Sequence, residues 1–171
     1  TDTTGVITQK LLTATIAASD KIYDGNDSAT ITGRTLVSLE VGDDVTAVGG
    51  TATFVSVNAG THEVSATGIT LDGGDALNYS YDGTATGAAD ITPLGITGSF
   101  TAGDKVYDGN TDAVALTQSL SSVLAGDESN VSLTGGTANF ADSNVATGIA
   151  VTASSIAFAT VNDDVIAIVA G

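Results

Sequence analysis

Hydrophobic and polar residues alternate with a period of two over short stretches of this chain. Residues 12–18 place an apolar side chain at every second position, and residues 96–102 repeat the pattern. Such alternation is typical of half-buried β-strands. Glycine pairs at Gly49–Gly50 and Gly73–Gly74 indicate turns. No amphipathic stretch is long enough for a stable helix, so the pattern predicts an all-β protein.

A second, longer pattern is an internal repeat. The segment K-I-Y-D-G-N at residues 21–26 returns as K-V-Y-D-G-N at residues 105–110. The segments that follow it also return, in the same order: residues 42–44 as 126–128, 49–54 as 135–140, and 58–61 as 144–147. The repeat predicts two copies of one building block.

The repeat sets the expected domain boundaries. The first copy covers residues 10–93 and the second covers 94–171, while residues 1–9 are either the tail of a preceding unit or a first strand. The second copy has no closing segment like I-T-P at residues 91–93, so we expect it to be truncated or different at its end. Short strands with frequent turns favour an immunoglobulin-like β-sandwich for each unit, with a β-grasp-like unit as the alternative.

The repeated hexapeptide is best explained as a corner that ends a strand. Asp-Gly between strand residues is a strong turn signal, since Gly25 and Gly109 accept positive φ without steric cost. The carboxylates of Asp24 and Asp108 are placed to accept backbone N–H groups of the same turn. We therefore interpret the hexapeptide as structural rather than catalytic.

The lysine and the tyrosine of the corner share one face of the strand, because they are two residues apart. This holds for Lys21 and Tyr23 and for Lys105 and Tyr107. Continuing the upstream alternation would turn both side chains outward. Either a bulge near residues 17–19 and 102–103 resets the register, or the tyrosine covers a seam between units. The lysine is expected to lie along the ring or to pair with a carboxylate.

The chain is strongly acidic: 20 Asp and Glu against 4 Lys and Arg give a formal net charge of −16 over 171 residues. Such a chain is repelled by nucleic-acid phosphates and by anionic membrane surfaces, so neither is an expected partner. No apolar run reaches the roughly 18 residues of a spanning helix, and we expect no membrane insertion. The acidity has two explanations, colloidal solubility and bound calcium.

Calcium is the only cofactor for which the sequence offers candidate ligands. Asp108, Asn110 and Asp112 follow the D-x-N-x-D spacing of calcium loops, but the glycine and the bidentate glutamate of such loops are absent. Acidic pairs at expected loops, with calcium between units, are the other option. The candidate ligands are Asp43, Asp44, Asp108, Asn110, Asp112, Asp127, Glu128, Asp163 and Asp164.

Catalysis is not expected. The chain has no cysteine and a single histidine, His62, so no Ser-His-Asp set or zinc site occurs in both copies. One covalent alternative stays open: isopeptide crosslinks that would join Lys21 to Asn58 and Lys105 to Asn144, because both residue types recur in register.

The ordered series K-[IV]-Y-D-G-N, G-D-[DE], G-G-T-A-x-F, N-x-x-T and I-x-[LF] resembles the YDG-type repeat of large bacterial surface and secreted adhesins. The resemblance covers about residues 6–171. The first copy carries the later motifs of that family at residues 75–79 and 91–93, whereas the second has Val165 and Ile166 where the first has Asn78 and Tyr79.

The resemblance implies an extracellular protein, secreted or on the bacterial cell surface, in which each unit is a spacer. Its partners would be adjacent repeats of the same chain, and a host or biofilm surface ligand would be reached through the parent protein. The alternative is that the units themselves mediate cell adhesion by binding glycan, mucin or neighbouring cells.

Overall fold

The computed structural model describes residues 4–114, 116–160 and 166–168, and the chain divides into unit 1 (Thr1–Pro93) and unit 2 (Leu94–Gly171). Strands make up 55% of the structure, and the sheets are curled. The described residues contain no α-helix, only the single 3-10 turn η1 (Ala76–Asn78). The prediction of an all-β protein is confirmed. Whether each unit is immunoglobulin-like or β-grasp-like stays a prediction.

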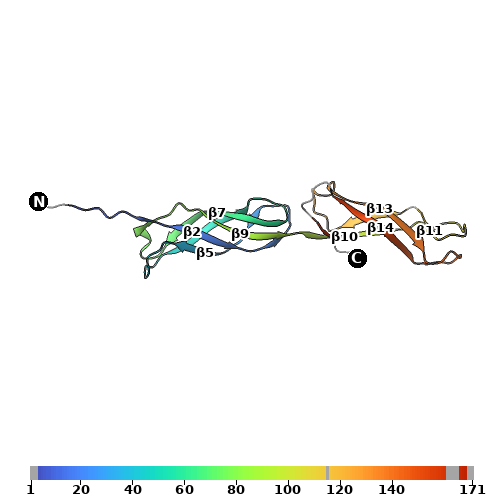
Figure 1. Ribbon diagram of the computed structural model, residues 1–171, viewed down its shortest axis with the longest axis horizontal. Helices are drawn as coiled ribbons and strands as arrows, with labels where there is room; N and C mark the ends of the chain where they lie inside the picture. The colour runs from blue at the N-terminus through green and yellow to red at the C-terminus, as the bar shows by residue number, and fades with distance from the viewer. Residues whose placement is uncertain (1–3, 115, 161–165, 169–171) are drawn as a thin grey trace. The chain divides into compact units, whose positions relative to one another are not determined.

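Unit 1 is built around one large sheet (Figure 1). The strands are β1 (Lys10–Leu11), β2 (Thr13–Ala18), β3 (Lys21–Ile22), β4 (Ser28–Ala29), β5 (Ile31–Val37), β6 (Thr46–Phe54), β7 (Gly60–Asp72), β8 (Tyr79–Ser80) and β9 (Ala85–Thr92). The sheet order is β4-β6-β7-β9-β2-β5, β3 also pairs with β9, and β1 pairs separately with β8. The last strand of the unit therefore lies in the middle of its sheet.

The predicted alternation is observed in β2 and the residue before it. Leu12 and Ile16 are buried and Ala14 and Ala18 partly buried, whereas Thr13 and Thr15 are exposed. The register of the β2–β5 pair shifts between Ala17 and Ala18, in agreement with the bulge predicted near residues 17–19. After this shift Tyr23 points inward and only 7% of its surface is exposed. The bulge predicted near residues 102–103 lies beyond the β10–β12 pairing, which ends with Thr101 opposite Thr117, and stays a prediction.

The central strand β9 packs closely against β2. Ala85, Ala89 and Ile91 are buried on its inner side. Between them, Gly87 approaches the backbone of β2 so closely that a Cβ atom there would lie 2.3 Å from the carbonyl oxygen of Ile16. A side chain at this position cannot be accommodated without separating the two strands, so the glycine permits the pairing.

Unit 2 repeats most of these elements in two smaller sheets. Its strands are β10 (Leu94–Thr101), β11 (Asp112–Ala113), β12 (Thr117–Ser121), β13 (Val131–Phe140), β14 (Val151–Thr160) and β15 (Ile166–Ile168). The sheet orders are β12-β10-β15 and β11-β13-β14. Within the described part of unit 2, only Ile96, Val131 and Ala138 are buried apolar residues, so the core described there is smaller than that of unit 1.

Equivalent contacts show that the two units share one plan. The Arg34 side chain of β5 donates to the Gly49 carbonyl oxygen in β6 at 2.8 Å. In unit 2, Gln118 of β12 donates to the Gly135 carbonyl oxygen in β13 at the same distance, 2.8 Å. The equivalents of β2, β5, β6 and β7 are therefore β10, β12, β13 and β14.

Candidate functional site

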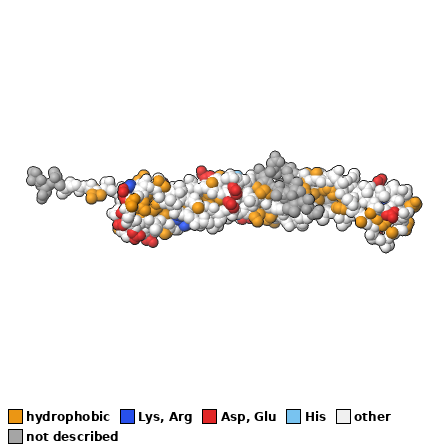
Figure 2. All heavy atoms as spheres, turned by 60° about the horizontal axis from the view of Figure 1, so that its bottom comes forward, with side chains coloured by type: hydrophobic (Ala, Val, Ile, Leu, Met, Phe, Trp, Pro, Cys, Tyr) orange, Lys and Arg blue, Asp and Glu red, His pale blue; other side chains and the backbone are white. Residues whose placement is uncertain are grey.

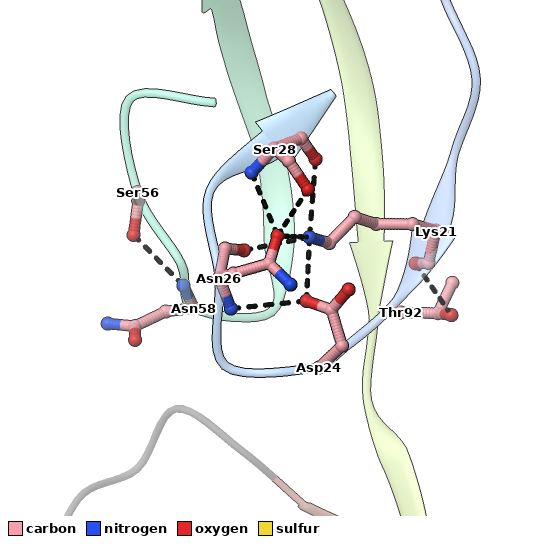
Figure 3. Close-up of polar contacts among 7 residues, drawn as sticks. All are labelled: Lys21, Asp24, Asn26, Ser28, Ser56, Asn58 and Thr92. Atoms are coloured by element: carbon pink, nitrogen blue, oxygen red, sulfur yellow. Dashed lines mark hydrogen bonds and ion pairs between the residues drawn. The ribbon is translucent and has the colours of Figure 1, made fainter. Parts of the chain in front are cut away.

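The repeated hexapeptide forms a compact corner around its own lysine, which we call the lysine corner (residues 21–28 and 105–112). In unit 1 the Lys21 Nζ atom lies 2.7 Å from Asp24 Oδ1. It also donates to the Asn26 carbonyl oxygen at 2.7 Å, to Asn26 Oδ1 at 3.0 Å and to the Ser28 carbonyl oxygen at 3.3 Å. The loop thus surrounds the ammonium group with four oxygen atoms (Figure 3).

The lysine corner of unit 2 has the same geometry. Lys105 Nζ lies 2.7 Å from Asp108 Oδ1. It donates to the Asn110 carbonyl oxygen at 3.0 Å, to Asn110 Oδ1 at 2.7 Å and to the Asp112 carbonyl oxygen at 3.1 Å. The last residue of the lysine corner differs between the copies, Ser28 against Asp112. Because this residue contacts the lysine through its backbone carbonyl oxygen, the contact does not depend on its side chain.

Local hydrogen bonds explain why this sequence makes the corner. Gly25 and Gly109 have φ of 77° and 80°, a region that favours glycine. The Asn26 amide donates to Asp24 Oδ1 at 3.2 Å, and Asn26 Oδ1 in turn accepts from the Ser28 amide at 2.9 Å and from its hydroxyl. Asp and Asn therefore each bond to the backbone two residues ahead, which is their usual role in turns.

The ammonium group affects the ionisation of its carboxylate partner in both units. The hydrogen bond from Lys21 lowers the pKa of Asp24, and the hydrogen bond from Lys105 lowers the pKa of Asp108. In each case a backbone amide adds to the effect. Lys21 also lies 5.7 Å from the centroid of the Phe54 ring, within cation–π range. These contacts hold the lysine in place at the corner.

The two corners differ in how far the tyrosine that follows the lysine by two positions is exposed to solvent. In unit 1 the Tyr23 amide donates to the Thr92 carbonyl oxygen at 2.8 Å, and the tyrosine is only 7% exposed. In unit 2 Tyr107 is 61% exposed. Nearly identical hexapeptides, which differ only in Ile22 against Val106, therefore give the same corner but a different exposure of the tyrosine.

The calcium-loop candidates of unit 2 surround a cation already present in the chain. Asp108 Oδ1 and Asn110 Oδ1 contact the Lys105 ammonium, and Asp112 contributes its carbonyl oxygen to the same group. The D-x-N-x-D spacing is thus explained by the lysine corner. Calcium at this loop stays an untested prediction.

The acidic pairs are placed in separate loops and take part in local hydrogen bonds. Asp43 accepts a 2.5 Å hydrogen bond from the Tyr79 hydroxyl, which raises the pKa of Tyr79. Asp44 Oδ2 accepts from a backbone amide at 3.1 Å, as does Glu128 Oε2 at 2.7 Å. The Asp127 carbonyl oxygen accepts from a backbone amide at 2.9 Å.

Two candidates, Asp163 and Asp164, lie outside the described residues. Across residues 4–114, 116–160 and 166–168, no group of three or more His, Cys, Asp or Glu side chains is arranged to hold a metal ion. The same part of the chain contains no helix long and apolar enough to span a membrane. On the face shown in Figure 2, acidic side chains are scattered and outnumber the basic ones.

The structure does not bring together the residues of the predicted crosslinks. The Lys21 ammonium contacts Asn26, and the Asn58 side chain points away from it (Figure 3). In unit 2, Asn144 Nδ2 donates to Asp142 Oδ1 at 2.9 Å, while Lys105 contacts Asn110. Sequence reasoning missed the asparagine of the hexapeptide as the partner of the lysine, although its recurrence in both copies was the available signal.

The YDG domain family model matches the chain twice, over residues 8–87 and 92–164. No curated protein and no solved structure matches the chain significantly.

Proposed function

The chain belongs to the YDG domain family, with two copies of the domain, and from this premise we propose that it is a structural spacer of a bacterial cell-surface adhesin. In this role the units extend a distal binding region away from the cell. The function is mechanical and requires no catalysis. The observation that carries the proposal is the way in which unit 1 joins its first strands to its last.

The first and last strands of unit 1 are parallel neighbours. In the pairing of β2 with β9, Ala14 lies opposite Ala85 and Thr15 opposite Thr86. In the pairing of β3 with the end of β9, Lys21 lies opposite Ile91. A third parallel pair joins β1 to β8. The two ends of the unit are therefore connected through parallel ladders as well as through the intervening chain.

This geometry suits a protein that carries tension. When the two ends are pulled apart, parallel neighbouring strands slide past each other, and the hydrogen bonds between them are loaded together. Strands of a hairpin pulled from their open end separate one hydrogen-bonded pair at a time. Each bond contributes only about 1 kcal/mol net, so simultaneous loading gives the higher resistance.

The lysine corner lies at the end of this load path. The Thr92 hydroxyl donates to the Lys21 carbonyl oxygen at 3.2 Å, and the Tyr23 amide donates to the Thr92 carbonyl oxygen at 2.8 Å. The corner thus fixes the backbone to which the last residues of β9 are bonded. Recurrence of the corner is explained if every unit of a longer array carries the same load.

The extracellular location is part of the proposal. A secreted or surface-exposed chain with 20 acidic and 4 basic residues resists self-association, which favours an array of many similar units. Its direct partners are adjacent repeats of the same chain. Contact with a host or biofilm ligand belongs to the distal region of the parent protein.

Increasing the number of copies tests the spacer role. Fusion proteins with increasing numbers of this chain between a cell-surface anchor and a reporter binding domain should raise the reporter farther from the surface, with its affinity unchanged. A Gly/Ser linker of equal residue number is the matched control and should give a smaller, coil-like distance. Saturable binding of the chain alone to glycan arrays, mucin or cells would contradict the spacer role and favour an adhesive module.

A further inference from the structure

The lysine corner has the ligand set of a cation-binding loop, and the cation at its centre belongs to the chain. In unit 1 four oxygen atoms lie between 2.7 and 3.3 Å from the Lys21 nitrogen. In unit 2 the equivalent four lie between 2.7 and 3.1 Å from the Lys105 nitrogen. Each set consists of a carboxylate oxygen, a side-chain amide oxygen and two backbone carbonyl oxygens, the kinds of oxygen that bind hard cations in proteins.

The loop positions these oxygen atoms through bonds that do not involve the lysine. In unit 1 the Asp24 carboxylate accepts from the Asn26 amide at 3.2 Å, and Asn26 Oδ1 accepts from the Ser28 amide at 2.9 Å. The equivalent bonds of unit 2 measure 3.1 and 2.9 Å. Oxygen atoms that face one point repel one another unless a positive charge lies between them. The folded loop therefore requires a cation, whatever its source.

The enclosure, size and charge of the site fit an ammonium group. The side chains of Lys21 and Lys105 are only 17% and 16% exposed, whereas that of Lys10, which pairs with the single carboxylate of Glu40, is 43% exposed. Calcium takes about six to eight oxygen ligands at roughly 2.3–2.6 Å, so it would need more oxygen atoms at shorter distances. One carboxylate contacts each ammonium, which balances one positive charge.

We propose that the lysine corner is a binding site for a primary ammonium ion, which each unit fills with its own lysine in place of a cation from solution. The corner depends on the cation and not on its covalent attachment to the loop. A unit built in this way keeps its corner closed at any external calcium concentration. The proposal rests on the contacts of the corner and is independent of the spacer role.

The direct test replaces the tethered cation with a free one in the 171-residue chain. Lys21→Ala removes the side chain beyond Cβ, and the n-propylammonium ion has the same carbon and nitrogen atoms as the part removed. We expect the substitution to lower the urea midpoint of unit 1, and saturating propylammonium chloride to restore at least about half of the loss. Lys105→Ala should behave in the same way in unit 2. Hydrogen exchange resolves the two units, and the unmutated unit is the internal control.

Three controls separate occupation of the site from general effects of salt. Tetramethylammonium chloride screens the acidic chain equally but has no N–H donor, so it should restore no more than it adds to the unmutated chain. Lys10→Ala removes a lysine that pairs with one carboxylate, and propylammonium should not restore its loss. Lys21→Met keeps the space filled without a charge, so this variant should lose stability and show no response.

A local measurement connects the restored stability to the corner itself. Propylammonium should slow amide exchange at Asn26 and Ser28 of Lys21→Ala by at least about tenfold, and adding Asp24→Asn should abolish this effect. If Lys21→Ala unfolds unit 1 completely, refolding of the unit by propylammonium is the same positive result. The proposal is overturned if propylammonium restores neither the midpoint nor the amide protection, or if tetramethylammonium acts equally well. Stronger restoration by calcium chloride would also overturn it, by identifying the corner as a calcium loop.

Discussion

The tyrosines of the two lysine corners provide a matched pair for measuring what burial of the ring contributes to stability. Tyr23 is 7% exposed, whereas Tyr107 is 61% exposed in an otherwise equivalent corner. A buried aromatic side chain covers roughly 150–250 Å², and truncation in a core costs about 3–5 kcal/mol. We therefore expect Tyr23→Ala to destabilise unit 1 by about 4 kcal/mol. Since less than half of Tyr107 is covered, Tyr107→Ala should cost unit 2 only about 1 kcal/mol.

Urea unfolding followed by hydrogen exchange, resolved by unit, measures both losses in one molecule. Peptides from β6 and β7 report on unit 1, and peptides from β13 and β14 report on unit 2. The unmutated unit is the internal control in each variant and should keep its midpoint. Equal losses for the two substitutions would refute the reasoning, because they would mean that Tyr107 is enclosed as fully as Tyr23.

The lysine, the central strand and the acidic loops lead to further expectations. Lys21→Met should destabilise unit 1 by about 1–2 kcal/mol in urea unfolding, a modest cost because the corner is partly exposed to solvent. Because Lys21 lowers the pKa of Asp24 below its ordinary value of 3.8, their interaction stabilises the fold above the unfolded-state pKa, and this contribution is lost as the pH falls through the lowered pKa. Asp24→Asn should therefore flatten the acid limb of a stability–pH profile, and an unchanged limb would contradict this. Gly87→Ala should destabilise unit 1 by about 2 kcal/mol or more, whereas Gly33→Ala, whose Cβ would meet another Cβ at 3.6 Å, should change the urea midpoint little. Chelator should leave the melting temperature unchanged, because the loop oxygens already surround Lys105, and a drop of several degrees would indicate bound calcium.

The sequence was sufficient to predict the parts of the fold that depend on local chemistry. Alternation of apolar residues identified β2, and the recurrence of a tyrosine at a position that this alternation turns outward suggested a bulge near residues 17–19, where the register shifts. The D-G-N turn was predictable because Asp, Gly and Asn each have a defined role in turns. The set of four oxygen atoms around the Lys21 ammonium was predicted only in part, since the sequence indicated a carboxylate partner but not the asparagine and backbone oxygens.

Other features depend on contacts between distant segments, which periodicity does not encode. The place of β9 is set by pairing with β2 and β7, about 70 and 25 residues away in sequence, and nothing in A-T-G-A-A-D-I-T specifies these neighbours. For the same reason, the two nearly identical hexapeptides gave no indication that Tyr23 is buried and Tyr107 exposed. The D-x-N-x-D spacing was ambiguous because an ammonium group and a calcium ion both require a cluster of oxygen atoms.

The central claim, that parallel terminal strands make the unit resist tension, is tested most directly by pulling one molecule in two directions. The chain has no cysteine, so paired cysteines define the attachment points uniquely. Thr8→Cys with Pro93→Cys loads the ends of unit 1, whereas Thr46→Cys with Asp72→Cys opens the β6–β7 hairpin from its free end. At the same loading rate, we predict a clearly higher unfolding force for the terminal pair than for the hairpin pair. An equal or lower force for the terminal pair would contradict the mechanical account.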